Sequence, residues 1–201
     1  MKVLITGFAP FNNEKINPSY EAVKLISDMI DDITLEKLEV PVSFNNAFLT
    51  VLDKLKDDDY DAVILVGQAG GRSMITLEKV AINYRYAAIA DNDGNSFNHE
   101  NIIEDGMDAY FTTLPIVKMV DKLNENSIKA SISFTAGAYV CNDLMYQVIK
   151  YLKDNNKKTK AGFIHVPFIK EQVEGKENIP YMELNDIVKG LSICIKESVG
   201  D

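Results

Sequence analysis

The chain has no tryptophan and only two cysteines and two histidines among its 201 residues. Two cysteines give no disulfide framework, and their scarcity favours a reducing, cytoplasmic compartment. No Cys-x-x-Cys or His-x-x-x-His spacing occurs, so we expect no metal site. The apolar run over residues 1–7 is too short for a signal peptide, and no run is long enough to span a bilayer.

Common catalytic signatures are missing as well. The serine-hydrolase pattern Gly-x-Ser-x-Gly is absent, as are the P-loop and Gly-x-Gly-x-x-Gly. Residues 67–72 (Gly-Gln-Ala-Gly-Gly-Arg) form a glycine-rich segment that lacks the P-loop lysine. This segment leaves two interpretations open, a phosphate or nucleoside cradle and a tight turn beside an occupied site.

The overall composition is that of an ordinary globular protein, with 46% hydrophobic and 25% charged residues. A formal net charge of -9 and a pI near 4.8 argue against nucleic acid and anionic membranes as partners. No repeat, low-complexity segment or linker divides the sequence. We therefore expect one domain over residues 1–201.

Hydrophobic periodicity predicts an alternation of strands and helices. Strands are expected at 2–6, 35–42, 61–67, 128–134 and 161–167, and helices at 19–30, 45–55, 115–124, 141–153 and 183–198, with Ser19 as the first N-cap. Strand-like stretches at 75–89 suggest a hairpin, 91–95 is a turn, and we expect the 75–95 region to add antiparallel strands. Residues 93–106 are expected to be irregular. Strands joined by helices of ten to fifteen residues indicate an α/β fold with a mostly parallel sheet covered on both faces.

Cys141 is the first candidate for chemistry, because it lies where a strand and a small-residue turn lead into a helix. The positive end of a helix dipole stabilises a thiolate, so we expect the pKa of this thiol to be lowered. The alternative is a buried packing cysteine, which is the role that we expect for Cys194.

His165 interrupts an apolar strand near its end, so its imidazole must be hydrogen-bonded or functional. The carboxyl ends of parallel strands share one sheet edge, where His165 and Cys141 would meet as base and nucleophile. Such a couple needs a third group to orient the imidazole. The acidic candidates are Glu78, Asp91, Asp93, Glu104 and Asp105, of which Glu78 precedes an apolar stretch.

Several longer motifs then resemble one family nearly end to end. They are Thr6-Gly-Phe-Ala-Pro-Phe11, Asn17-Pro-Ser19, Gly67-Gln-Ala-Gly-Gly-Arg72, Glu78-Lys-Val-Ala-Ile-Asn83, Ala136-Gly137 with Val140-Cys-Asn142, and Gly162-Phe-Ile-His-Val-Pro167. In this order the motifs resemble the pyroglutamyl peptidase I family of cysteine peptidases, which remove an N-terminal pyroglutamyl residue.

The resemblance implies a three-layer α/β/α sandwich, a homotetramer and no cofactor. It assigns Cys141 as nucleophile, His165 as base and Glu78 as the orienting carboxylate. The family's substrate pocket corresponds to Phe8, Phe11, Asn17, Gln68, Ile89, Tyr139 and Val140. We expect Phe8 and Phe11 to be exposed aromatic residues of a loop. Their ring faces would pack against the flat lactam of a peptide with N-terminal pyroglutamate.

Two departures from the family pattern concern catalysis. The family commonly has an arginine, close to the reacting centre, where this chain has Ala88, and Arg85 is the nearest arginine that would replace it. Losing one oxyanion donor costs about a hundredfold in rate. The alternative function is therefore a weakened homologue that binds pyroglutamyl peptides or a related lactam. Tyr139 also replaces the family's phenylalanine and adds a hydroxyl to the pocket wall.

Overall fold

The computed structural model describes residues 1–200 and has a seven-stranded central sheet in the order β10-β5-β11-β4-β1-β3-β2. The strands are β1 (Lys2–Phe8), β2 (Met29–Ile30), β3 (Ile33–Val40), β4 (Ala62–Gln68), β5 (Ile75–Glu78), β10 (Ala130–Ser133) and β11 (Lys160–Val166). Neighbours pair in parallel except at β11–β5 and β2–β3. The mostly parallel sheet with some antiparallel pairing is confirmed.

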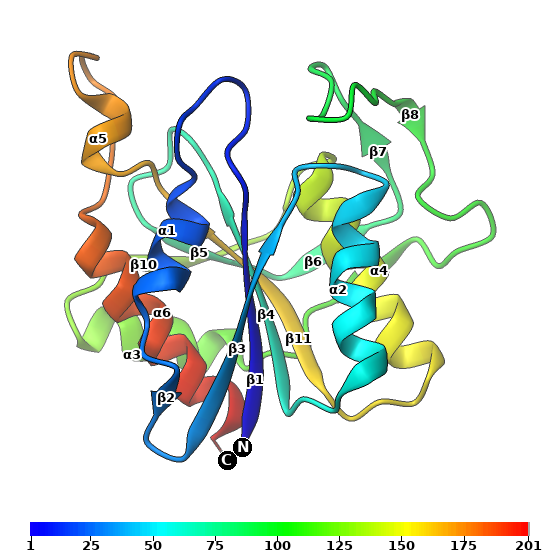
Figure 1. Cartoon of the computed structure of the whole chain (residues 1–201), viewed down its shortest axis with the longest axis horizontal. Coiled ribbons are helices and arrows are strands. Elements are labelled where there is room, and N and C mark those ends of the chain that lie inside the picture. Colours follow the sequence, from blue (N-terminus) through cyan, green and yellow to red (C-terminus); the bar gives the residue numbers. More distant parts are fainter. Residues whose placement is uncertain (201) are drawn as a thin grey trace.

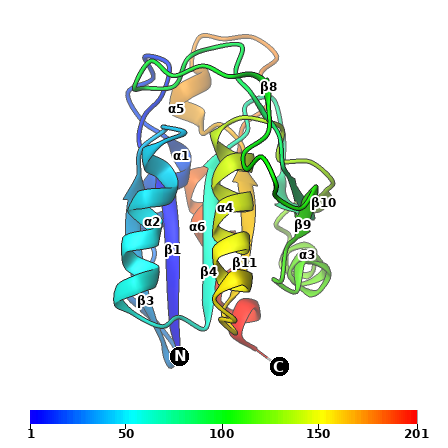
Figure 2. The same ribbon diagram turned by 90° about the vertical axis from the view of Figure 1, so that its right-hand side faces the viewer.

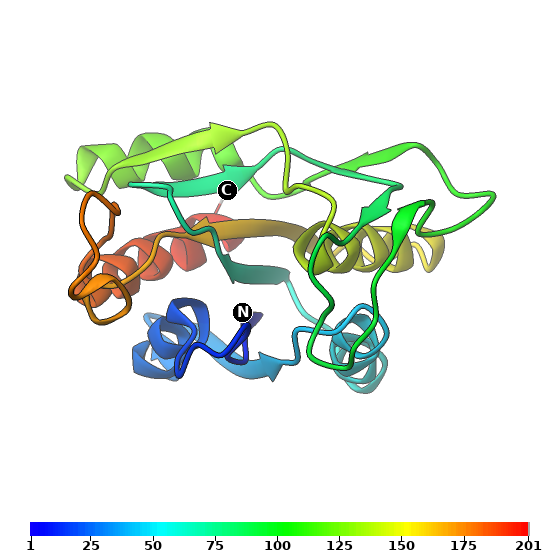
Figure 3. The same ribbon diagram turned by 90° about the horizontal axis from the view of Figure 1, so that it is seen from above.

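Helices cover both faces of this sheet, as Figures 1 and 3 show. One apolar core lies under α1 (Pro18–Leu25), α3 (Ile116–Glu125) and α6 (Leu184–Val199). The second lies under α2 (Asn46–Asp57) and α4 (Val140–Asp154). The result is the three-layer α/β/α sandwich, with α5 (Lys170–Val173) beyond the carboxyl ends of the parallel strands.

Both ends of the first helix differ from the sequence expectation. The first helix is capped by Asn17, whose side chain accepts from the Ser19 backbone N–H, and it ends at Leu25 instead of continuing to Ile30. The chain becomes extended at Ile26, and Met29–Ile30 pair antiparallel with β3 as an edge strand. Sheet pairing therefore overrides the helical spacing of these apolar residues.

The 75–100 region does not form the expected hairpin. After β5 joins the central sheet, β6 (Val80–Ile82) pairs with β9 (Ala109–Phe111) and β7 (Arg85–Tyr86) pairs with β8 (Asn98–Glu100). The segment 93–106 is thus not wholly irregular, because β8 lies within it. These partners are distant in sequence, which local patterns do not report.

One end of the molecule brings together four segments: the loops after β1 and β4, the β7–β8 ribbon and the first turn of α4 (Figures 1 and 2). The termini of the described chain lie at the opposite end. None of the helices within residues 1–200 has the length and apolarity that a membrane span requires.

Candidate active site

Cys141 is the second residue of α4, after the N-cap residue Tyr139. Its backbone N–H belongs to the first turn, where N–H groups have no acceptor within the helix. The sulfur lies opposite Gly67, and a β-carbon on that glycine would be 3.2 Å from Sγ. Gly67 is the register partner of His165 on the neighbouring strand, so the thiol and the imidazole lie at the same sheet edge.

His165 is buried and hydrogen-bonded to Glu78, with Nδ1 2.7 Å from Oε1. This contact crosses the antiparallel β11–β5 pair, where Thr76 is the register partner of His165. Glu78 is itself fully buried, and the Nη1 atom of Arg72 donates to the same Oε1 over 2.7 Å. The carboxylate therefore fixes one ring nitrogen and leaves Nε2 for proton transfer.

Burial sets the protonation states of the couple. It raises the pKa of the Cys141 thiol to about 12, and the charge of Glu78 adds to that rise. Burial also lowers the pKa of His165, more than the Glu78 carboxylate raises it. The expected lowering of the thiol pKa is therefore wrong, because desolvation outweighs the helix terminus. The pair rests as neutral thiol and neutral imidazole.

Glu78 remains ionised although it is buried. Desolvation alone would raise the pKa of this carboxyl, but the hydrogen bond from His165, and the charge that His165 carries at the acid pH where Glu78 titrates, outweigh it, and Arg72 acts in the same direction. The net pKa is lowered. A buried carboxylate beside an imidazole holds the ring orientation and stabilises the imidazolium that forms during proton transfer.

The other acidic candidates lie elsewhere. Asp91 accepts from the backbone N–H groups of Phe44, Asp93 and Asn95, so it organises the turn at 91–95. Glu104 and Asp105 are exposed. Among these five acids, Glu78 alone is hydrogen-bonded to His165 within the described residues.

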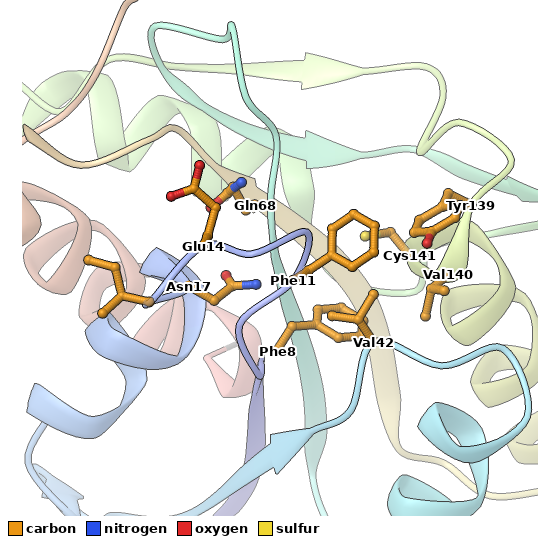
Figure 4. Close-up of a pocket in the computed structure, with 10 residues that line it drawn as sticks. Phe8, Phe11, Glu14, Asn17, Val42, Gln68, Tyr139, Val140 and Cys141 are labelled. Carbon is orange, nitrogen blue, oxygen red and sulfur yellow. The ribbon is translucent and has the colours of Figure 1, made fainter. Parts of the chain in front are cut away.

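A cavity of about 210 Å³ opens beside Cys141, and Figure 4 shows the side chains around it. Six of the seven expected substrate-pocket residues line it together with Cys141: Phe8, Phe11, Asn17, Gln68, Tyr139 and Val140. The volume lies below the range of drug-sized ligand pockets, which suits a small ring.

Ile89 is the expected pocket residue that the structure does not bring to this cavity. Its side chain is 57% exposed, and it lies in the loop between β7 and β8. Phe8 also differs from expectation, because it ends β1 and is buried, 6.3 Å from the ring of Phe163. The ring of Phe11 packs against that of Tyr139, with their centroids 5.6 Å apart, so the two rings form one wall of the pocket (Figure 4).

The polar groups of the pocket are already oriented. Asn17 donates to the Ala9 carbonyl and accepts from Ser19, so its amide is fixed. Gln68 accepts from Gln172, which in turn accepts from the backbone N–H of Ile169. Fixed polar groups among aromatic faces suit a neutral ring that carries one amide.

Three further lining residues were not anticipated from the sequence: Glu14, Ile16 and Val42. Glu14 and Ile16 belong to the same loop as Phe11 and Asn17, so loop membership was the available signal. Val42 follows β3, the sheet neighbour of β1. Its place depends on strand order, which the sequence did not specify.

The glycine-rich segment carries the orienting arginine instead of a free phosphate cradle. Arg72 donates to Glu78 and to the hydroxyl of Thr76. Gly70 packs against the ring of Phe168, where a β-carbon would be 2.4 Å from Cζ. Within residues 1–200, no group of His, Cys, Asp and Glu side chains is arranged to hold a metal ion.

A thiol, an imidazole and an orienting carboxylate beside a small cavity define the class of cysteine hydrolases. The pyroglutamyl peptidase family model matches residues 1–200. The chain therefore belongs to the pyroglutamyl peptidase family.

Relatives and solved structures agree with that assignment. The chain is 49% identical over 199 residues to the pyrrolidone-carboxylate peptidase of Brachyspira hyodysenteriae, covering 99% of both chains. It is also 49% identical to that of Clostridium perfringens, covering 99% of this chain and 93% of the relative. The crystal structure of Bacillus amyloliquefaciens pyroglutamyl peptidase I superposes with a TM-score of 0.95 at 39% identity, covering 98% of this chain and 96% of the other.

Proposed function

We propose that this chain is a cysteine exopeptidase that hydrolyses the bond after an N-terminal pyroglutamyl residue. The supporting observation is the hydrogen bond between His165 and Glu78 beside the cavity that Cys141 lines. The substrates are peptides with N-terminal pyroglutamate, whose lactam enters the cavity and whose remaining chain points to solvent. The proposed reaction uses no cofactor.

The reaction proceeds through a thioester. Nε2 of His165 takes the Cys141 proton as Sγ attacks the pyroglutamyl carbonyl carbon, and the carbonyl oxygen becomes an oxyanion. The backbone N–H of Cys141 donates to that oxyanion. The imidazolium protonates the departing amine, the C–N bond breaks, and the thioester remains. His165 then takes a proton from water, the hydroxide attacks, and pyroglutamate leaves as the thiol is restored.

Because thiol and imidazole both start neutral, attack requires transfer of the thiol proton to His165. Glu78 stabilises the imidazolium that forms. This scheme assigns no oxyanion contact to Arg85, whose Nε donates to Asp143 and whose guanidinium lies over Phe44 and Phe97. Ala88 is exposed, and its side chain carries no hydrogen-bond donor.

We also propose that the protein is a cytoplasmic homotetramer of single-domain subunits. Three large apolar side chains support association, since Phe111, Val117 and Phe134 are each more than 60% exposed. Sedimentation equilibrium tests this assembly against the 22.5 kDa monomer. A monomeric mass at micromolar concentration would contradict it.

The activity is tested by release of the chromogenic amine from a pyroglutamyl amide. Cys141→Ser is expected to lose about a thousandfold or more in kcat, because the hydroxyl is a far weaker nucleophile. Cys194→Ala is the matched control, since Cys194 is fully buried on α6. Full activity in Cys141→Ser would exclude this mechanism, and a folded wild type without turnover would exclude the function.

A further inference from the structure

Arg85 connects the first turn of α4 to the aromatic wall of the cavity. Its Nε donates to Oδ2 of Asp143, which lies two residues after Cys141 in that turn. The Asp143 side chain is only 2% exposed, and its Oδ1 accepts from Gln147 one turn further along α4. The carboxylate is thus fully engaged inside the protein.

The guanidinium of Arg85 also faces two aromatic rings. Its Cζ lies 4.8 Å from the ring centroid of Phe97 and 5.8 Å from that of Phe44. Both distances fall within the range at which a cation is attracted to a ring face. Arginine suits this position because its planar group stacks and pairs with a carboxylate at the same time.

The two rings transmit this contact to the pocket. Phe44 packs edge-on against Phe97 at 4.9 Å and against Tyr139 at 5.1 Å, and Tyr139 in turn packs against Phe11 in the cavity wall. The backbone N–H of Tyr86 donates to the Ala138 carbonyl, which holds β7 beside the residue before Tyr139. A continuous series of contacts therefore joins Asp143 to the wall beside Cys141.

We propose that Arg85 is a positioning residue of the pocket, which fixes Phe44 and Tyr139 in place before the lactam binds. Arg85 does not touch the substrate and acts through the ring of Phe44. This inference rests on the proposed function, because it assigns the cavity to the lactam. It predicts an effect on lactam affinity and on KM, with little effect on kcat.

The test uses a charge-free double variant, because Arg85→Met alone would leave the buried Asp143 carboxylate unpaired and endanger folding. In Arg85→Met/Asp143→Asn, KM for the pyroglutamyl amide is expected to rise about threefold to tenfold with kcat within twofold, since a desolvated cation–π contact is of that size. The Kd of 2-pyrrolidone, measured by calorimetry, should rise by the same factor. The matched control Lys150→Met/Asp154→Asn removes an exposed ion pair from α4, the helix that also contains Asp143, and should change neither constant.

Phe97→Leu keeps the Arg85–Asp143 pair but removes the ring on which the guanidinium stacks, and Phe97 does not line the cavity. It is also expected to raise both KM and Kd. This variant takes the place of the double variant in the test if the double variant does not fold. Wild-type KM and Kd in a folded double variant, or in Phe97→Leu where the double variant does not fold, would overturn the positioning role. Absence of turnover in the wild type would instead overturn the proposed function.

Discussion

Oε1 of Glu78 lies 2.7 Å from Nδ1 of His165, and the same oxygen accepts from Arg72. One carboxylate oxygen thus orients the imidazole and is itself held by a cation from the glycine-rich loop. Both Glu78 and His165 are buried, so the contact is shielded from water. The arrangement makes Glu78 the determinant of which ring nitrogen is available to the thiol.

Glu78→Gln is expected to lower kcat about a hundredfold to ten-thousandfold. The amide keeps the shape of the carboxylate but loses the charge that stabilises the imidazolium and fixes its tautomer. Turnover of a pyroglutamyl amide measures the effect, and circular dichroism checks the fold. Glu104→Gln is the control, because that acid is exposed, and it should retain activity within twofold. Equal losses in both variants would contradict the assigned role.

Alkylation of Cys141 by iodoacetamide is expected to accelerate steadily as the pH rises from 6 to 10. The reactive species is the thiolate, and the thiol pKa is raised to about 12, so the thiolate fraction grows tenfold per pH unit over this range. The assay uses Cys194→Ala protein, so that one thiol is present. A rate that is already maximal at pH 6 would show a preformed thiolate–imidazolium pair and would disprove the neutral resting state.

The acid limb of kcat/KM is expected below pH 6.5. His165 must be neutral to take the thiol proton, and burial lowers its pKa in the folded protein from the ordinary value near 6.5. The imidazole therefore stays neutral to lower pH than an exposed histidine does. A pH–rate profile at low substrate concentration reports this group in the free enzyme. An acid limb above pH 7 would contradict the direction of the shift.

Local sequence patterns predicted the positions of some residues of the candidate site. Cys141 at a helix start and His165 at a strand end were visible from periodicity, because both elements are long and apolar. Glu78 was one of five acids until the β11–β5 pairing joined it to His165. Val42 and the pairing of β7 with β8 depend on strand order and on partners distant in sequence, which periodicity does not encode. Desolvation reversed the expected thiol pKa, since burial depth is a property of the packed fold.

Gly67→Ala is expected to lower kcat/KM about tenfold to a hundredfold. A β-carbon there would lie 2.7 Å from Cζ of Phe163 and 3.2 Å from Cys141 Sγ, so this sulfur must move, and small displacements of the proposed nucleophile are costly. Gly71→Ala is the control. It meets open space, but its φ of +85° strains an alanine, which costs about 1 kcal/mol of stability without affecting the rate. Similar kcat/KM losses in both would refute the steric explanation.

Tyr139 is the N-cap residue of α4 and Tyr146 lies within that helix, but their hydroxyl groups differ in what they bind. The Tyr139 hydroxyl is buried and has no hydrogen-bond partner among residues 1–200, whereas the Tyr146 hydroxyl donates to the Met107 carbonyl over 2.7 Å. An unsatisfied buried hydroxyl costs stability, and a satisfied one contributes about 0.5–1.5 kcal/mol. Replacing each tyrosine by phenylalanine should therefore act in opposite directions on the free energy of unfolding.

Tyr139→Phe is expected to leave that free energy unchanged or raise it by about 1 kcal/mol, because the variant removes a polar group that has no partner. Tyr146→Phe should lower it by about 0.5–1.5 kcal/mol, because the Met107 carbonyl then loses its donor. Urea unfolding of both variants at pH 7 provides the comparison, since neither phenol ionises there: burial raises the pKa of each to about 12. A larger loss in Tyr139→Phe than in Tyr146→Phe would mean that the Tyr139 hydroxyl has a partner in solution.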